Sequence, residues 1–315
     1  MKKIGILFGM ENTYPWAFIN RVNEKAKGKF IAEAVKVDTV HNDKNYDYAV
    51  IIDRISQDVP FYRAFLKNAA LKGTAVINNP FWWSADEKYF NYTLSHQLGI
   101  PTPKTVLIPS NARPDDTDER SFRNLNLMEW DDIFEYLTFP FFMKPHSGGG
   151  WKSVYKIHNK EEFFEKYNET GQLVMTLQEN IDFDSYYRCY GLETKDIHVM
   201  PYEPRNEPHL RYVADFKPSA KLLKEMISHV KSINGSLGYD FNTCEFAIKD
   251  GIPYAIDFGN PAPDADLNSV GEENFEWIVE HTAEMALRRA KAHKDGQQNL
   301  TWGSFVNKSV AGKSL

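Results

Sequence analysis

Residues 243–258 have the sequence TCEFAIKDGIPYAIDF, in which two apolar segments flank the turn-forming residues Lys249-Asp250-Gly251. Asp and Gly favour tight turns, so the segment predicts a β-hairpin. Each predicted strand carries one acid in an apolar setting, Glu245 in the first strand and Asp257 in the second. The two acids are symmetric about Gly251, which places them opposite each other on one face, with Cβ atoms about 4.5–5.5 Å apart.

Two carboxylates at this spacing repel each other unless a proton or a cation lies between them. Asn260 follows and adds an amide oxygen. Carboxylate and amide oxygens suit Mg²⁺, which also binds nucleotide phosphates. The alternative is a solvated hairpin face on which the acids need no cation, and a β-bulge would shift the register by one residue. The apolar residues around both acids favour the metal site.

A second segment, 139–156, has the sequence FPFFMKPHSGGGWKSVYK. It predicts an apolar strand that ends in Lys144, followed by a turn with Ser147 and three glycines at 148–150. Glycines allow backbone N–H groups to converge on an anion, and Lys144 could lie over the same phosphates. The segment is neither a Walker A loop nor a GxGxxG motif. A plain flexible turn is the alternative.

A third segment, 177–181, has the sequence LQENI and predicts a strand that leads into a short linker. The exposed main chain of such a linker can hydrogen-bond a purine edge, while Asp182 or Asp184 binds ribose hydroxyls. The alternative is an ordinary strand exit. Arginines, whose planar side chains match phosphates and carboxylates, lie between this linker and the hairpin at positions 188, 205 and 211.

Six other residues with versatile side chains are assigned to packing. Cys189 and Cys244 fit the interiors of predicted strands, so we expect them to pack rather than to react. The remaining four are aromatic residues that we expect in the core and not in a base-stacking platform: Trp82, Trp83, Phe90 and Tyr92.

The composition is that of an ordinary globular chain of 315 residues, with 42% hydrophobic and 25% charged residues. The formal net charge of −6 argues against a nucleic-acid partner, which requires a surplus of Lys and Arg. Two cysteines, without a CxxC pair, argue against a disulfide framework and a zinc site. The apolar run after Met1 is too short for a signal peptide, and no run is long enough to span a membrane. We therefore expect a cytoplasmic protein.

The first part of the chain alternates strands and helices, which predicts an α/β layer with a parallel sheet. The expected strands are 3–8, 48–53 and 75–78, and the expected helices are 16–27 and 61–72. From residue 139 onward the pattern changes to hairpins, with helices expected at 219–233 and 273–291.

These pieces, in this order, resemble the ATP-grasp superfamily, which includes D-alanine–D-alanine ligase, glutathione synthetase and biotin carboxylase. The resemblance extends from about Met1 to Ala290. Asp86-Glu87-Lys88 and the later GIPTP at 99–103 look like a helix and exit passage of the family. Other matching pieces are FMKP at 142–145, QENI at 178–181, the acids Glu245 and Asp257, and Asn260-Pro261.

The resemblance implies an α/β protein with the ATP-grasp fold and three parts. The N-terminal α/β domain would cover residues 1–105, a lid subdomain 106–181, and a C-terminal nucleotide- and metal-binding subdomain 182–293. The tail, 294–315, would lie outside them.

The resemblance also implies site roles for individual residues. Lys88 and Lys144 would contact ATP phosphates, and Glu245, Asp257 and Asn260 would hold Mg²⁺. The remaining roles are phosphate closure by Ser147, Gly148, Gly149 and Gly150, adenine contact by Glu179, Asn180 and Ile181, ribose contact by Asp184, and oxyanion contact by Arg188 or Arg211.

Three departures from the family pattern concern the metal and ribose residues. Asp257 replaces the usual Glu, Asn260 lies three residues after it instead of two, and the acid after the linker is closer than in D-alanine–D-alanine ligase. Asp240 is a rival to Glu245 as metal ligand, because some members of the family use an acid in that setting.

The function implied is an ATP-dependent, ADP-forming carboxylate–amine ligase that acts through an acyl phosphate. Its partners would be small-molecule or peptide acids and amines, without nucleic acid or membrane, and a homo-oligomer is compatible with the pattern. The alternative is a non-catalytic module that binds ATP or ADP. The intact acid pair and both lysines favour the enzyme.

Overall fold

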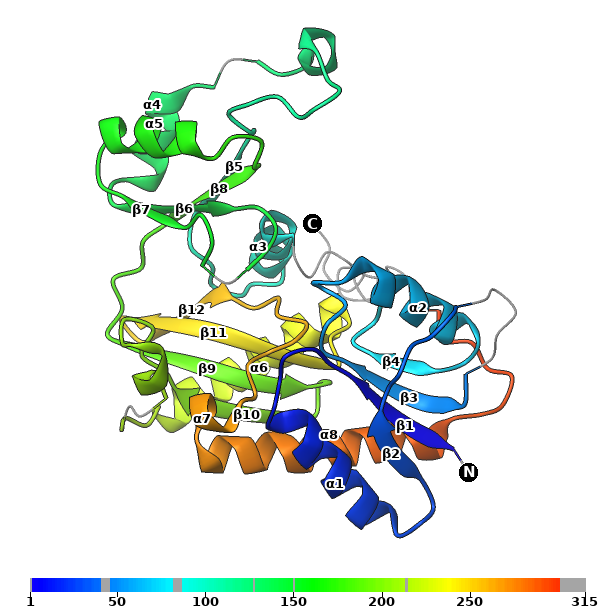
Figure 1. The fold of residues 1–315 in the computed structure, drawn as a ribbon. Coiled ribbons are helices and arrows are strands. Elements are labelled where there is room, and N and C mark those ends of the chain that lie inside the picture. Colours follow the sequence, from blue (N-terminus) through cyan, green and yellow to red (C-terminus); the bar gives the residue numbers. More distant parts are fainter. Residues whose placement is uncertain are drawn as a thin grey trace.

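Three four-stranded sheets form the frame of the described protein (Figure 1). The computed structural model describes residues 2–40, 46–81, 87–126, 128–149, 151–212 and 215–300. Among these residues, none of the helices combines the length and the apolar character that a bilayer span requires. The mixed α/β fold agrees with the prediction from sequence.

The N-terminal sheet, sheet A, is wholly parallel, with the order β2-β1-β3-β4. Apolar runs such as YAVIID form strands that helices cover, as the alternating pattern predicted. Its strands and helices are β1 (Lys3–Leu7), α1 (Tyr14–Ala26), β2 (Ile31–Ala34), β3 (Tyr48–Asp53), α2 (Pro60–Leu71) and β4 (Ala75–Ile77). The edge strand β2 was not predicted, because four residues with a central Glu give too short a pattern.

Sheet B is antiparallel, with the order β5-β8-β6-β7, and it projects away from sheet A (Figure 1). Helices α4 and α5 cover it, and aromatic rings from both helices fill a small core with strand residues. Its elements are β5 (Thr105–Ile108), α4 (Trp130–Leu137), β6 (Phe141–Pro145), β7 (Tyr155–Ile157), α5 (Lys160–Glu169) and β8 (Met175–Glu179), with a 3₁₀ turn, η2, at Glu119–Phe122.

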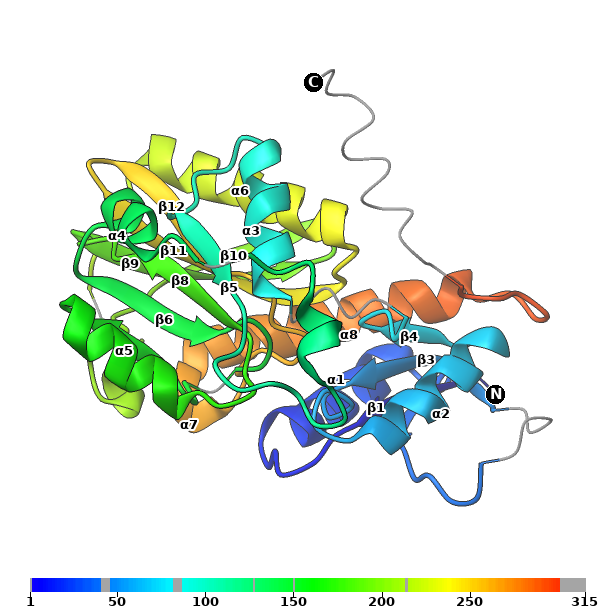
Figure 2. The same cartoon turned by 90° about the horizontal axis from the view of Figure 1, so that it is seen from above.

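Sheet C is also antiparallel, with the order β10-β9-β11-β12, and sheet B lies over it (Figures 1 and 2). Helix α6 packs on one face of sheet C, and α3 lies beside sheet B and near β12. The elements are α3 (Lys88–Gln97), β9 (Ser185–Leu192), β10 (Asp196–Pro201), η3 (Pro208–Leu210), α6 (Ala220–Leu237), β11 (Phe241–Lys249) and β12 (Ile252–Asp257).

The last helix among the described residues, α8 (Glu272–Ala292), follows the short α7 (Leu267–Val270) and runs beneath both sheets A and C (Figure 1). It packs on α1, and Arg21 binds Glu280 at 2.6 Å across this contact. One buried cluster contains residues of α1, β1, β3, β9, β11 and α8. The carboxyl edge of sheet A therefore lies beside the loop that follows β12.

Candidate functional site

The hairpin of β11 and β12 places Glu245 directly opposite Asp257, which confirms the predicted pairing. The register places Phe246 opposite Ala255 and then shifts, so that Ile256 is the extra residue of a β-bulge. Without this bulge, Glu245 would lie opposite Ile256, and Asp257 would belong to the other face. The bulge therefore creates the acid pair.

The centre of the turn in this hairpin differs from the predicted centre. Its two central residues are Asp250 and Gly251, with φ angles of 52° and 75°, and Lys249 pairs with Ile252. The hairpin is thus centred between two residues instead of on Gly251. The predicted pair was correct because the bulge compensates for the half-residue error in the predicted centre.

Strand alternation separates two faces of sheet C. Cys189 and Cys244 lie opposite each other on β9 and β11 and are buried with residues of α6, so both pack as predicted. Arg188 and Glu245, paired at the next position, point to the other face. The site is therefore built on the face away from α6.

Glu245 is enclosed by polar partners on this face. The Tyr186 hydroxyl donates to its Oε2 at 2.7 Å, and Arg188 Nε lies 3.5 Å from its Oε1. Burial raises the pKa of Glu245, Asp257 raises this pKa further, and Arg188 opposes both effects. The net direction is upward, so burial and the neighbouring Asp257 together outweigh the effect of Arg188.

Lys144, on β6, supplies a cation that faces the acids. Its Nζ donates to Gln178 Oε1 at 2.7 Å and to the Tyr92 hydroxyl at 2.8 Å. Loss of solvent lowers the pKa of Lys144 to about 8, and Asp257 and Glu245 oppose this shift. Sheets B and C thus bring the predicted phosphate lysine and the predicted metal acids into electrostatic contact.

The glycine-rich turn lies beside the second predicted lysine. Lys88 is the first residue of α3, and its Nζ donates to the Gly148 carbonyl at 2.9 Å. Ser147, Gly148 and Gly149 are exposed, and a Cβ on either glycine would meet no atom within 4 Å. Only Gly148 of these two has a left-handed φ, at 93°. Gly150 lies outside the described residues, as do Trp82 and Trp83.

The linker after β8 is held by backbone contacts. Lys104 N donates to Glu179 Oε2 at 3.1 Å, while Asn180 and Ile181 are partly buried. Asp184 accepts from Asp250 N at 3.3 Å, so its carboxylate supports the turn of the acidic hairpin. In this arrangement each of the two carboxylates accepts one backbone hydrogen bond through one of its oxygens and retains the capacity to bind a ligand.

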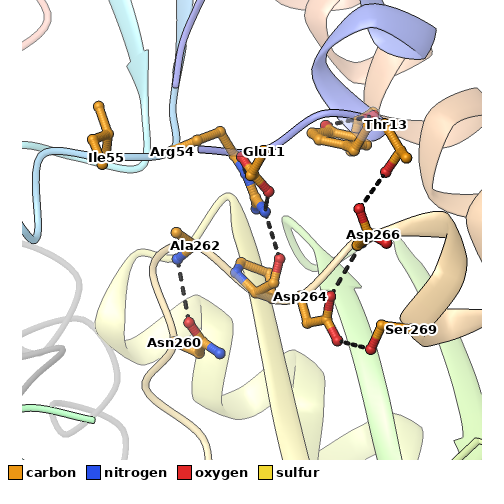
Figure 3. Close-up of polar contacts among 12 residues, drawn as sticks. Glu11, Thr13, Arg54, Ile55, Asn260, Ala262, Asp264, Asp266 and Ser269 are labelled. Carbon is orange, nitrogen blue, oxygen red and sulfur yellow. Dashed lines mark hydrogen bonds and ion pairs between the residues drawn. The ribbon is translucent and has the colours of Figure 1, made fainter. Parts of the chain in front are cut away.

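Asn260 begins a loop that several side chains fix (Figure 3). Its backbone N donates to Asn242 Oδ1 at 2.9 Å, and its own Oδ1 accepts from Ala262 N at 3.3 Å. An amide oxygen has two lone pairs, so this oxygen retains the capacity to bind a cation.

Loops at the carboxyl edge of sheet A hold the continuation of this loop (Figure 3). Arg54, which is 4% exposed, donates to the Pro263 carbonyl at 2.7 Å and forms an ion pair with Glu11. Thr13 donates to Asp266 Oδ2 at 2.8 Å. Loops that precede the acidic hairpin in sequence thus hold the segment that follows it.

Two further predicted residues have different surroundings. Arg211 donates through Nε to the Asn206 carbonyl at 3.0 Å, hydrogen-bonds Tyr202, and weakly lowers the pKa of Glu245. Asp240 instead binds Arg289 at 2.5 Å, and burial raises its pKa to about 6. Asp240 thus belongs to a structural ion pair with α8, and this argues against it as the rival metal ligand.

Sequence reasoning missed two residues of the site. Tyr92 was assigned to the core, and its ring is indeed buried, but its hydroxyl contacts Lys144. Tyr186 received no role, although it binds Glu245. The available signal for Tyr186 was its position on the same strand face as Arg188.

Comparisons with known proteins concern the fold. No protein-family model matches the chain, and no curated protein matches it either. Among solved structures, D-alanine–D-alanine ligase from Bacillus anthracis complexed with ATP has a TM-score of 0.64 at 15% identity, covering 92% of this chain and 98% of that chain. VanG D-Ala:D-Ser ligase from Enterococcus faecalis has a TM-score of 0.65 at 14% identity, covering 92% and 99%. The ATP-grasp ligase PsnB, complexed with minimal precursor, Mg and ADP, has 0.58 at 14%, covering 91% and 98%.

The chain has the ATP-grasp fold. Within this ATP-grasp fold, the residues that converge are Lys144, Glu245, Asp257 and Arg188, from sheets B and C. No cluster of three or more His, Cys, Asp or Glu side chains suited to a metal occurs in the described residues. A cation site on this ATP-grasp frame would consist of two acids and an amide.

Proposed function

We propose that this protein is an ATP-dependent ligase that joins a carboxylate to an amine through an acyl phosphate. The observation that carries the proposal is the bulge that pairs Glu245 with Asp257 on the face toward Lys144. A structural hairpin gains nothing from two acids held opposite each other, because their repulsion costs stability. The solved structures that share the fold, two of them complexed with ATP or with Mg and ADP, support the proposal.

The donor set fits Mg²⁺. Glu245 and Asp257 supply carboxylates and Asn260 supplies an amide oxygen, and burial together with the neighbouring Asp257 raises the pKa of Glu245, an effect that a bound cation would oppose. When bound, the ion would neutralise charge on the phosphates of the nucleotide. These three residues would hold it, and Lys88 and Lys144 would hold the phosphates from the other side.

The proposed reaction has two steps. An oxygen of the acid forms a bond to the γ-phosphorus as the bond to the β-phosphate oxygen breaks, which gives the acyl phosphate and ADP. The amine then attacks the acyl carbon, the C–N bond forms, and phosphate leaves while the nitrogen loses a proton. An arginine would stabilise the oxyanion formed on the acyl oxygen.

We assign this oxyanion contact to Arg211 in preference to Arg188. The Arg188 guanidinium already lies against Glu245, donates to the Tyr212 hydroxyl at 2.8 Å and reaches Thr243 Oγ1 at 3.5 Å. Arg211 is partly exposed, it hydrogen-bonds a backbone carbonyl and Tyr202, and its effect on the pKa of Glu245 is smaller than that of Arg188, so it has more capacity to contact a substrate. Arg188 would then position Glu245.

The proposal is tested with purified protein, Mg·ATP and a panel of acids and amines that includes amino acids and short peptides. We expect ADP release that requires both an acid and an amine, and a higher melting temperature with Mg·ATP. Stabilisation by Mg·ATP without ADP release from any pair would favour the non-catalytic module. No stabilisation at millimolar Mg·ATP would contradict both functions.

A further inference from the structure

Tyr92 lies where α3 meets sheets B and C. Its side chain is 4% exposed, and its ring packs edge-to-face on Phe258 with ring centroids 5.2 Å apart. A phenylalanine at this position would fill the same space and pack equally well. A buried hydroxyl is costly unless it forms hydrogen bonds, so the contacts of the oxygen require a reason.

The hydroxyl of Tyr92 links two elements of the site. It accepts a hydrogen bond from Lys144 Nζ at 2.8 Å, and it donates its proton to the Ile256 carbonyl. Gln178 Oε1, the other acceptor of Lys144, lies 3.3 Å from the same hydroxyl. Ile256 is the extra residue of the β-bulge that brings Asp257 opposite Glu245.

The position of this contact matters because a bulge leaves its extra residue outside the regular ladder of the sheet. The Ile256 carbonyl receives its hydrogen bond from a side chain of α3. The same oxygen atom orients the ammonium of Lys144. Burial raises the pKa of Tyr92, as do Asp257 and Glu245, while Lys88 lowers it, so the hydroxyl keeps its proton and remains a donor.

We propose that Tyr92 is a positioning residue that fixes Lys144 and the Asp257 bulge relative to each other. One oxygen atom then fixes the position of both Lys144, which would bind the phosphates, and Asp257, which would bind the cation. The inference rests on the proposed function, because it assumes that Lys144 binds phosphates and that Asp257 binds a divalent cation.

The test uses Tyr92→Phe, which removes only this oxygen. Calorimetry measures ADP affinity in the absence of metal, which reports on Lys144. Electron paramagnetic resonance measures Mn²⁺ affinity of the ADP complex, which reports on the acids and does not depend on turnover. We expect metal-free ADP binding to weaken several-fold and Mn²⁺ binding to weaken about tenfold, as for other groups that orient metal ligands.

The matched control is Tyr14→Phe. Tyr14 is also a buried tyrosine, and its hydroxyl donates to Thr282 Oγ1 at 3.0 Å, in the contact between α1 and α8. We expect this variant to lower the melting temperature and to leave both affinities unchanged. All affinities are measured below the melting midpoint of the least stable variant, so a loss of stability cannot imitate a loss of binding.

Gln178→Met separates the two effects of the hydroxyl. Gln178 contacts Lys144 and not the bulge, so its loss should weaken metal-free ADP binding and leave Mn²⁺ affinity unchanged. The proposal is overturned if Tyr92→Phe resembles Tyr14→Phe, or if Gln178→Met weakens Mn²⁺ binding as much as Tyr92→Phe does. If the unaltered protein binds neither ADP nor Mn²⁺, the proposed function fails and not the role of Tyr92 alone.

Discussion

The acidic hairpin and the glycine-rich turn approach the same site but are held in opposite ways. In the hairpin, Glu245 has a tyrosine and an arginine partner, and its register is fixed by two neighbouring strands. In the turn, Gly148 and Gly149 are exposed and have open space where a side chain would be. Trp151, just beyond them, is 64% exposed.

The hairpin is held by packing and hydrogen bonds, whereas the turn has little packing around Gly148 and Gly149. The paired acids Glu245 and Asp257 repel each other, so they keep their position only if the sheet holds them before any ligand arrives. Backbone N–H groups that bind phosphate carry no such repulsion and can be ordered by the ligand itself. A variant in the hairpin should therefore abolish chemistry, whereas a variant in the turn should weaken it.

The largest effect is expected for Asp257→Asn. Its exposed side chain contributes little to folding, so the melting temperature should remain within about 2 °C. Loss of one carboxylate from the cation site should reduce Mg²⁺-dependent ADP release at least about 100-fold. The matched control is Asp250→Asn in the turn of the same hairpin, where Asn is equally favoured. Full Mg²⁺-dependent turnover by Asp257→Asn would place the site elsewhere.

A smaller effect is expected from pH, through Lys144. Its pKa of about 8 means that the side chain loses its charge as pH rises through that value. Affinity for ADP should therefore be up to about tenfold weaker at pH 9 than at pH 7, measured by calorimetry without metal. Lys144→Met should bind ADP more weakly, with a flat profile over this range. A steep profile in Lys144→Met would assign the titration to another group.

A milder effect should follow from Gly148→Ala. A side chain at φ 93° is strained, but the site is open, so the protein should fold while turnover falls about tenfold or less. Gly171→Ala is the control, since Gly171 has φ 56° and equally open surroundings in the α5–β8 turn. Equal turnover in the two variants would make the glycine-rich segment a plain turn. Gly149 has no left-handed φ, so Gly149→Val tests only the space needed by the phosphates.

The smallest effect concerns the stability of the apo hairpin. Because the folded pKa of Glu245 is raised, its contribution to stability is present at low pH and is lost as pH rises through the folded pKa. Glu245→Gln removes this loss. Its melting temperature relative to the unaltered protein should therefore increase as pH rises from about 4, just below the ordinary carboxyl pKa, to 7.5, by about 2–4 °C for each kcal/mol. A constant difference across this range would show that Arg188 already neutralises the acid.

Sequence patterns predicted which strands carry the site residues better than they predicted the detailed geometry of the site. Glu245 and Asp257 stood out because single acids interrupted apolar strands, and the hairpin pairs them. The bulge at Ile256 could not be predicted, because no special residue marks it. The hydroxyl of Tyr92 was hidden for a different reason: helical periodicity assigns a side chain to a face but does not show what its tip contacts.

The linker after β8 and the loop after β12 show a second limit of prediction from sequence. Asp184 has the order and spacing of a ligand-binding acid, yet its carboxylate supports the hairpin turn. The contact of Arg54 with the Pro263 carbonyl joins residues 209 positions apart. Neither contact leaves a local signal, because each depends on how the three sheets are assembled.

The contact between α1 and α8 also has a consequence for biosynthesis. Tyr14 and Arg21 find their partners on α8, 268 and 259 residues later in the chain. Contacts this distant in sequence form slowly, and the part of α1 that packs on α8 stays uncovered on the ribosome until α8 has been translated. The N-terminal layer, although made first, should therefore complete its folding last, and its nascent form should depend on chaperones.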